Sequence, residues 1–541
     1  MRGAIAEKGT PALNPSGQKA ARQLSCTGRE ASSQRVVHLP PRCLRLAPAK
    51  TVDRNAIQIP YAHQLRTRKA LLKTQLKPLM IVGCTSSAGK SLVVTALARW
   101  FARQGVDVVP FKAQNMSNNA RVVPGGEIGV AQWLQALAAR VPPTVAMNPV
   151  LLKPEADTQS QVVVNGTVRH DLTAMPWRDR GEHLWPAMTS AFDALRAAHE
   201  LVLIEGAGSP AEINLQDLVN NGMMEYADAA GLLVVDIDRG GSFAHLFGTW
   251  SLTQASTRER LAGFVLNKFR GDPSLLEPGP SMMRDMTGMQ FGGNLPMLAH
   301  ELPDEEGATI QGSHGAGGPV VGIVRYPFAS NLDEFHVLGH AAEVLWVLSP
   351  RDLERCDLVI LPGSKHVSAD LDWLRDRALD QALVARAGDQ QSIIGICGGC
   401  MMLGSDIIDP SSVEGSAPGL GILPLRTTFD PIKVTKPATV RFPTMPEPFA
   451  KLGGVMSSGY EIRNGRISGE ACKLSPLLWG KESVLATTVH GLLENPQVLG
   501  ALCGCEPEPV LEKTFEALAD AVDEHLDTVF LRTLVGLAPS P

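Results

Sequence analysis

The sequence predicts an α/β protein with two doubly wound, mostly parallel-sheet domains. Short apolar strand runs alternate with helical stretches from position 79 onward. In each half of the chain, a glycine-rich turn that carries reactive side chains directly follows such a run. The chain also has 51 Gly and 39 Pro with 44% hydrophobic and only 5% aromatic residues, which is typical of tight turns around ordinary cores.

The chain has 541 residues, and its charged residues are distributed unevenly along it. A prior of about 150 residues per domain suggests about three domains. Residues 1–77 hold 15 Lys/Arg against 3 Asp/Glu, so the remainder of the chain is acidic. We expect residues 1–76 to be a disordered basic extension, with an organelle address or a start-site artefact as alternatives. The acidic remainder argues against a broad nucleic-acid interface.

Cysteine usage and hydropathy indicate the compartment. Nine cysteines, an odd number without framework spacing, favour free thiols in a reducing environment. No apolar run approaches the ~18 residues of a membrane span. The sequence therefore predicts a cytoplasmic protein without membrane or nucleic-acid partners, and leaves an oligomer of identical chains open.

The positions of the strand runs along the sequence indicate the extent of each domain. Those of the first domain, 77–305, lie at 79–82, 106–111, 201–204, 232–235 and 264–266. A glycine-rich stretch predicts a linker at 306–318. The second domain, 319–505, has strand runs at 320–324, 358–361 and 393–396. Apolar residues at helical spacing in 506–541 predict a C-terminal helix, which we expect to pack on the second domain.

The first glycine-rich turn, 83–91, has the parts of a phosphate-binding loop. Gly83 and Gly89 let backbone N–H groups face oxygen, Lys90 suits the β/γ-phosphates, and the Ser91 hydroxyl suits Mg²⁺. A chance Gly-Lys-Ser at a turn is the alternative, but a strand precedes the loop and a helix follows it. The loop is one residue longer than usual and resembles dethiobiotin synthetase-like enzymes. Positions 84–88 lack the extra lysine of partition ATPases, which favours a ligase.

The second turn, 395–399, predicts a nucleophile elbow. A strand precedes Cys397 and a helix follows it, which would lower the pKa of an exposed thiol. His490 can act as base and then as acid. Cys400 competes for the role, but only Cys397 has Gly at −2 and +2. A zinc site is a further alternative, formed by Cys397, Cys400, Cys503 and Cys505.

This second half resembles class I glutamine amidotransferase domains. Such domains usually carry a Glu two residues after the His, whereas this chain has Leu492 there and Glu494 two residues later. We therefore predict a Cys–His dyad, with Glu494 as an open candidate for the acid that orients the imidazole.

Five polar segments, most of them directly after strand runs, resemble cobyric acid synthases from about position 80 to the C-terminus. They lie at 111–119, 147–154, 157–162, 205–215 and 236–241. The sister diamide-forming enzyme carries a Gly-Pro-Asp-Tyr-type segment where this chain has Gln114-Asn115-Met116. The resemblance implies ATP- and glutamine-dependent amidation of the b, d, e and g carboxylates of adenosylcobyrinic acid a,c-diamide, giving adenosylcobyric acid.

The chemistry that the resemblance implies suggests roles for further residues. Activation of a carboxylate as an acyl phosphate needs Mg²⁺ and cations around the phosphoryl group. Ser91 and Glu205 are the expected metal ligands, and Glu212 is a second carboxylate for which a structural role is equally expected. Lys112 would steady phosphoryl oxygens, and Asn267 would contact the nucleotide base.

Two other functions remain open at this point. One is a glutamine-dependent ligase that acts on another polycarboxylate, such as a cell-wall precursor. The other is an ATP-binding regulatory protein with an inactive glutaminase domain.

Overall fold

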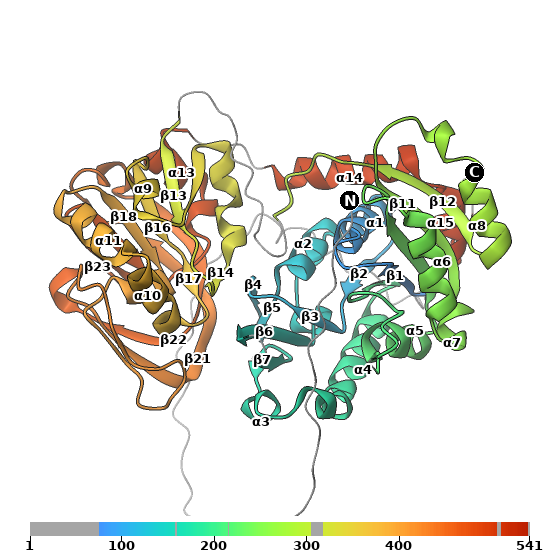
Figure 1. The fold of residues 1–541 in the computed structure, drawn as a ribbon, viewed down its shortest axis with the longest axis horizontal. Coiled ribbons are helices and arrows are strands. Elements are labelled where there is room, and N and C mark those ends of the chain that lie inside the picture. Colours follow the sequence, from blue (N-terminus) through green and yellow to red (C-terminus); the bar gives the residue numbers. More distant parts are fainter. Residues whose placement is uncertain (1–74, 157–158, 215, 304–317, 506–509, 539–541) are drawn as a thin grey trace, which may run out of the picture. The chain divides into compact units, whose positions relative to one another are not determined.

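The computed structural model describes residues 75–156, 159–214, 216–303, 318–505 and 510–538 (Figure 1). The predicted basic extension and the predicted linker fall almost entirely outside these residues. None of the described helices is long and apolar enough to cross a membrane.

The first domain is built on a six-stranded parallel sheet. Its strands in spatial order are β12 (Gln290–Pro296), β11 (Leu261–Phe269), β10 (Ala230–Asp236), β1 (Leu79–Gly83), β9 (Leu201–Glu205) and β2 (Val108–Phe111). Alternate residues of β1 enter two separate cores: Leu79 and Ile81 lie in one, and Met80 and Val82 in the other. Successive side chains of a strand point to opposite faces, so both faces of this sheet are covered, as predicted.

Helices and smaller sheets complete this domain. The longer helices are α1 (Lys90–Arg103), α2 (Val130–Ala138), α4 (Arg180–Ala198), α6 (Ser242–Leu252) and α8 (Gly279–Thr287). A small sheet contains β3 (Gln114–Met116), β6 (Val150–Ala156), β7 (Gln159–Val164) and β8 (Thr167–Val168). A hairpin pairs β4 (Ala120–Val123) with β5 (Gly126–Gly129).

The second domain has a seven-stranded mixed sheet. Its strands in spatial order are β15 (Glu343–Val347), β13 (Val320–Val324), β16 (Leu358–Leu361), β18 (Ser392–Ile396), β25 (Val484–Thr487), β24 (Leu478–Lys481) and β23 (Lys473–Ser475). The first five run parallel, and the last two form an antiparallel edge. The long strands β21 (Arg426–Arg441) and β22 (Met456–Ser468) pair as an antiparallel hairpin (Figure 1).

The described helices of the second domain include α10 (Val367–Asp376), α11 (Leu379–Gly388), α12 (Gly398–Met402) and α13 (Pro496–Cys503), and a 3-10 helix, η5 (Leu332–His340). Two doubly wound α/β domains are therefore present, which confirms the predicted fold class.

The C-terminal helices α14 (Leu511–His525) and α15 (Thr528–Val535) correct one expectation. They pack on the first domain, not on the second: Phe515 and Leu531 belong to the core that contains β1. Buried Arg99 of α1 forms ion pairs of 2.6 and 2.8 Å with Glu512 and Glu516 of α14.

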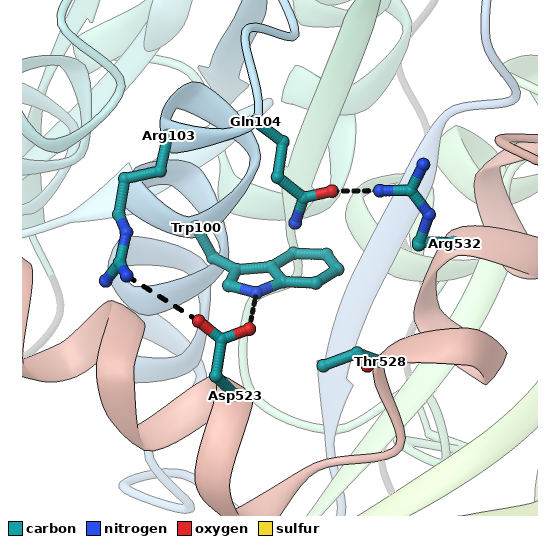
Figure 2. Close-up of a pocket in the computed structure, with 6 residues that line it drawn as sticks. All are labelled: Trp100, Arg103, Gln104, Asp523, Thr528 and Arg532. Carbon is teal, nitrogen blue, oxygen red and sulfur yellow. Dashed lines mark hydrogen bonds and ion pairs between the residues drawn. The ribbon is translucent and has the colours of Figure 1, made fainter. Parts of the chain in front are cut away.

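Figure 2 shows the same contact around Trp100, whose indole nitrogen donates to Asp523 over 2.6 Å. The helical apolar spacing indicated a packed helix, but it contained no information about which domain would receive it. The acidic side chains on α14 and the basic ones on α1 decide the partner.

Candidate active sites

The phosphate loop connects β1 to α1, as predicted. Gly89, the N-cap of α1, has φ 97°, and a Cβ there would lie 2.0 Å from Asn267 Nδ2. Only glycine fits both the left-handed backbone and the close side chain. Lys90 Nζ lies 3.2 Å from the carbonyl oxygen of Gly208 and 3.4 Å from that of Thr85, and the Ser91 side chain points to the end of β9.

Glu205 is the centre of a buried polar group at the end of β9. Ser91 Oγ donates to its Oε1 over 2.8 Å, and Lys112 Nζ lies 2.8 Å from the same oxygen. The side-chain amides of Gln132 and Gln135 donate to Oε2. Burial alone would raise the pKa of Glu205, but the charge of Lys112 and these hydrogen bonds lower it below its ordinary value.

The structure thus brings three predicted residues together and holds the carboxylate ionised. A hydroxyl beside an ionised carboxylate is an oxygen donor set that suits Mg²⁺. Glu212 is exposed in the turn after β9, and among the described contacts it joins none of this group. The geometry brings Ser91 and Glu205 together, and the metal-ligand roles of Ser91, Glu205 and Glu212 stay predictions.

The side chain of Asn267 forms a hydrogen bond with the backbone of the phosphate loop. Its side chain is fully buried at the end of β11, and Nδ2 donates to the Ala88 carbonyl over 2.9 Å. The adjacent Lys268 donates to the Ser87 carbonyl over 2.7 Å. The observed contacts position the phosphate loop, and recognition of a base by Asn267 stays a prediction.

Cys397 occupies the predicted strand–turn–helix elbow between β18 and α12. Its φ of 51° and ψ of −103° are strained for a residue with a side chain. A Cβ on Gly399 would lie 2.0 Å from the carbonyl oxygen of Leu361, and one on Gly395 would lie 2.5 Å from Leu403 Cδ1. Glycine at both flanking positions is thus required to form this turn.

His490 follows β25 and lies at the Cys397 thiol. Burial would lower the pKa of His490, but the charges of Glu334 and Cys397 and hydrogen bonds to both side chains raise it to about 10. Glu334 Oε1 lies 2.7 Å from His490 Nδ1, and Oε2 accepts the Gly491 N–H over 2.7 Å. The imidazole is thus fixed with Nδ1 toward a carboxylate and is favoured in its protonated form.

Beside the predicted pair of Cys397 and His490 the structure places a carboxylate that the prediction lacked, in the position of a third triad member. That carboxylate, Glu334, comes from η5, 156 positions before the histidine. The open candidate Glu494 instead pairs with Arg121 of β4 at 2.5 Å. No local spacing connects η5 to the turn after β25, so sequence reasoning missed Glu334.

The surroundings of Cys397 and Cys400 favour Cys397 as the nucleophile. Cys400 is fully buried, and burial raises the pKa of its thiol well above the ordinary range. Cys397 is also mostly buried, at 5% exposed, but it lines a pocket, and Cys400 is not among the residues that line it. In the part of the chain that the structure describes, the one group of three or more metal-binding side chains within coordinating reach contains no cysteine. The four-thiolate zinc site is thus not formed.

The pocket beside Cys397 is lined by residues of both domains. Lys153 belongs to β6 of the first domain, and Lys433 and Arg463 come from the β21–β22 hairpin. Buried Glu127 joins the two domains, since it contacts Lys433 and lies 2.6 Å from Lys153 Nζ. Burial opposes ionisation of Glu127, but these two ammonium groups lower its pKa to about 2.

Comparison with known proteins agrees with both sites. Residues 79–309 match the CobQ/CobB/MinD/ParA nucleotide binding domain, and residues 320–498 match the CobB/CobQ-like glutamine amidotransferase domain. The cobyric acid synthase of Variovorax paradoxus (strain S110) is 49% identical over 475 residues, covering 85% of this chain and 99% of that protein. That of Paracidovorax citrulli (strain AAC00-1) is 50% identical over 477 residues, covering 83% and 97%.

The chain belongs to the cobyric acid synthase family. It is a glutamine-dependent amide ligase of cobalamin biosynthesis that uses glutamine and a nucleotide, as the two domains indicate.

Two solved structures overlap the chain in part. A glutamine amidotransferase crystal structure covers 37% of this chain and 98% of its own, with 19% identity and a TM-score of 0.24. The septum site-determining protein MinD from Pyrococcus horikoshii covers 41% and 82%, with 15% identity and a TM-score of 0.25. Likenesses this weak carry no argument about this chain.

Proposed function

We propose that this enzyme amidates the b, d, e and g carboxylates of adenosylcobyrinic acid a,c-diamide, using ATP, Mg²⁺ and glutamine. The observation that carries the proposal is the presence, on one chain of this family, of a Cys–His–Glu triad and a phosphate loop whose serine meets an ionised buried carboxylate.

The triad accounts for nitrogen release. The Cys397 thiolate attacks the side-chain carbonyl carbon of glutamine, and His490 donates its proton to the departing ammonia. His490 then takes a proton from water, which attacks the thioester and releases glutamate. Glu334 keeps the imidazole in one tautomer and orientation during both steps. Arg463 and Lys365 in the pocket suit the α-carboxylate of glutamine.

The phosphate loop accounts for carboxyl activation. A corrin carboxylate oxygen attacks the γ-phosphorus of ATP, and ADP leaves. Ammonia then attacks the acyl carbon, loses a proton and displaces phosphate. Lys90 and Lys112 are placed to neutralise phosphoryl oxygens. Ser91 and Glu205 would hold Mg²⁺, which supplies further neutralisation of the triphosphate.

Mass spectrometry of the corrin tests this proposal. Incubation with ATP, Mg²⁺ and glutamine should give four successive amidation products, with ADP and glutamate formed in step with them. A panel of other polycarboxylates, including cell-wall precursors, should give no ADP. ADP formation with another acceptor but none with the corrin diamide would contradict the assigned substrate.

The regulatory alternative makes a different prediction for glutamine hydrolysis. An inactive glutaminase domain would release glutamate no faster in the wild type than in Cys397→Ala. The formed triad instead predicts that glutamate release depends on this sulfur.

A further inference from the structure

Three side chains outside both active sites converge on one point. His336 and His340 lie four residues apart on η5, and Glu301 lies beyond the end of β12. The Nε2 atoms of the two histidines are 3.3 and 3.2 Å from the same Glu301 Oε2. All three candidate ligand atoms lie within 4.8 Å of one another.

These contacts to Glu301 are long for hydrogen bonds. Both Nε2 atoms are buried, and within the described residues neither has a partner with hydrogen-bond geometry. Protonation of both rings would place two positive charges on imidazoles whose centroids are 5.9 Å apart. A single cation among the three atoms would satisfy both nitrogens and the carboxylate oxygen at once.

We propose that Glu301, His336 and His340 form a binding site for a divalent transition metal of the zinc class. Bonds of about 2.0–2.1 Å to nitrogen and oxygen place tetrahedral ligand atoms about 3.4 Å apart, close to the two nitrogen–oxygen distances observed here. Two imidazoles disfavour Mg²⁺ and Ca²⁺, which prefer oxygen ligands. A water would complete the coordination.

The position of the site gives it a structural role. The same helix η5 carries Glu334, which orients His490, and Asp333, which forms a salt bridge with Arg121 of the first domain. Glu301 belongs to the segment that leaves the sheet of the first domain. A metal would therefore tie that segment to the helix that holds the catalytic histidine in place.

Co²⁺ titration of the full-length, chelator-treated protein tests the site directly. In excess Mg²⁺, which occupies the nucleotide site, we expect about one equivalent of Co²⁺ to give the visible absorption of four-coordinate cobalt without a thiolate charge-transfer band. H336Q, H340Q and E301Q should each weaken binding by at least about tenfold, the loss seen when even an outer partner of a metal ligand is removed.

His183→Gln is the matched control, because this histidine is exposed on α4 and should leave binding unchanged. The absence of saturable cobalt binding, a thiolate band, or unchanged binding in H340Q would overturn the proposal.

Thermal melting provides a second readout that does not depend on enzyme activity. Zn²⁺ should raise the melting temperature of the wild type and of H183Q, and should leave that of H340Q unchanged. An equal rise in all three proteins would show that zinc acts elsewhere and would contradict the site.

Discussion

Replacement of Glu334 by Gln tests the triad most directly. The substitution keeps the size of the side chain and removes the charge that faces His490 Nδ1 over 2.7 Å. It leaves the Cys397 elbow and the phosphate loop untouched. The consequence should therefore appear in glutamine hydrolysis and not in binding of the nucleotide.

The size of the expected loss of activity can be judged from the pKa of His490. A change of the His490 pKa from 6.5 to about 10 corresponds to about 5 kcal/mol in favour of the imidazolium. Glu334 is the first of the two charges that raise this pKa, so a neutral amide in its place removes a large part of the stabilisation of the imidazolium. We expect the kcat for glutamate release to fall by at least about tenfold, because a neutral amide no longer holds the imidazolium in one tautomer and orientation.

The raised pKa of His490 also predicts in which direction stability and activity change with pH. Because the pKa is raised on folding, the His490 ion pair contributes stability that is complete below about pH 6.5 and is lost as pH rises through about 10. Activity that needs the imidazolium should fall over the upper part of this window. In Glu334→Gln the falling limb should move to lower pH.

A coupled assay of glutamate release tests whether Glu334 is the acid that orients His490. Glu494→Gln is the control. Glu494 is the acid nearest in sequence to His490, but it pairs with Arg121. Its substitution should change kcat only a few-fold. If Glu334→Gln kept wild-type kcat and pH profile while Glu494→Gln lost activity, the assignment of the third member would be wrong.

Three further predictions concern other parts of the molecule. Cys397→Ala should abolish glutamine-dependent amidation and spare amidation driven by added ammonium, whereas a similar loss with both nitrogen sources would refute separate sites. Gly89→Ala should raise the KM for ATP at least about tenfold, because a Cβ would strike Asn267 and the positive φ would be strained; an unchanged KM in steady-state kinetics would contradict this. Arg121→Met should destabilise the protein by about 3–5 kcal/mol, since it leaves buried Asp333 unpaired; denaturant unfolding that shows no loss would refute the importance of this pair.

Local patterns explain which parts of the sites the sequence could predict. Gly89, Lys90 and Cys397 each lie in a strand–turn–helix segment, where backbone geometry and chemistry depend on neighbouring residues. Lys112 and Glu205 were found because the carboxyl ends of parallel strands meet at one edge of a sheet. Such residues are visible as motifs without knowledge of the tertiary structure.

Residues that act across long separations were not visible in this way. Glu334 reaches His490 only because η5 packs beside the turn after β25. The docking of α14 on α1 depends on complementary charges more than 400 positions apart. A single sequence specifies the amphipathic helix and the acidic residue, but not the surface that each one meets.

The contact between the domains connects the surroundings of His490 to the first domain. Arg121 of β4 pairs with Asp333 and Glu494 and lies over the Tyr460 ring, which stacks on His490 at 5.5 Å. Buried ion pairs add little net stability because desolvation offsets their attraction, but they strongly penalise any arrangement that separates them. Asp333 immediately precedes the acid that orients His490. A shift of β4 that displaced Arg121 would therefore disturb the catalytic histidine from two sides, through η5 and through the stacked tyrosine.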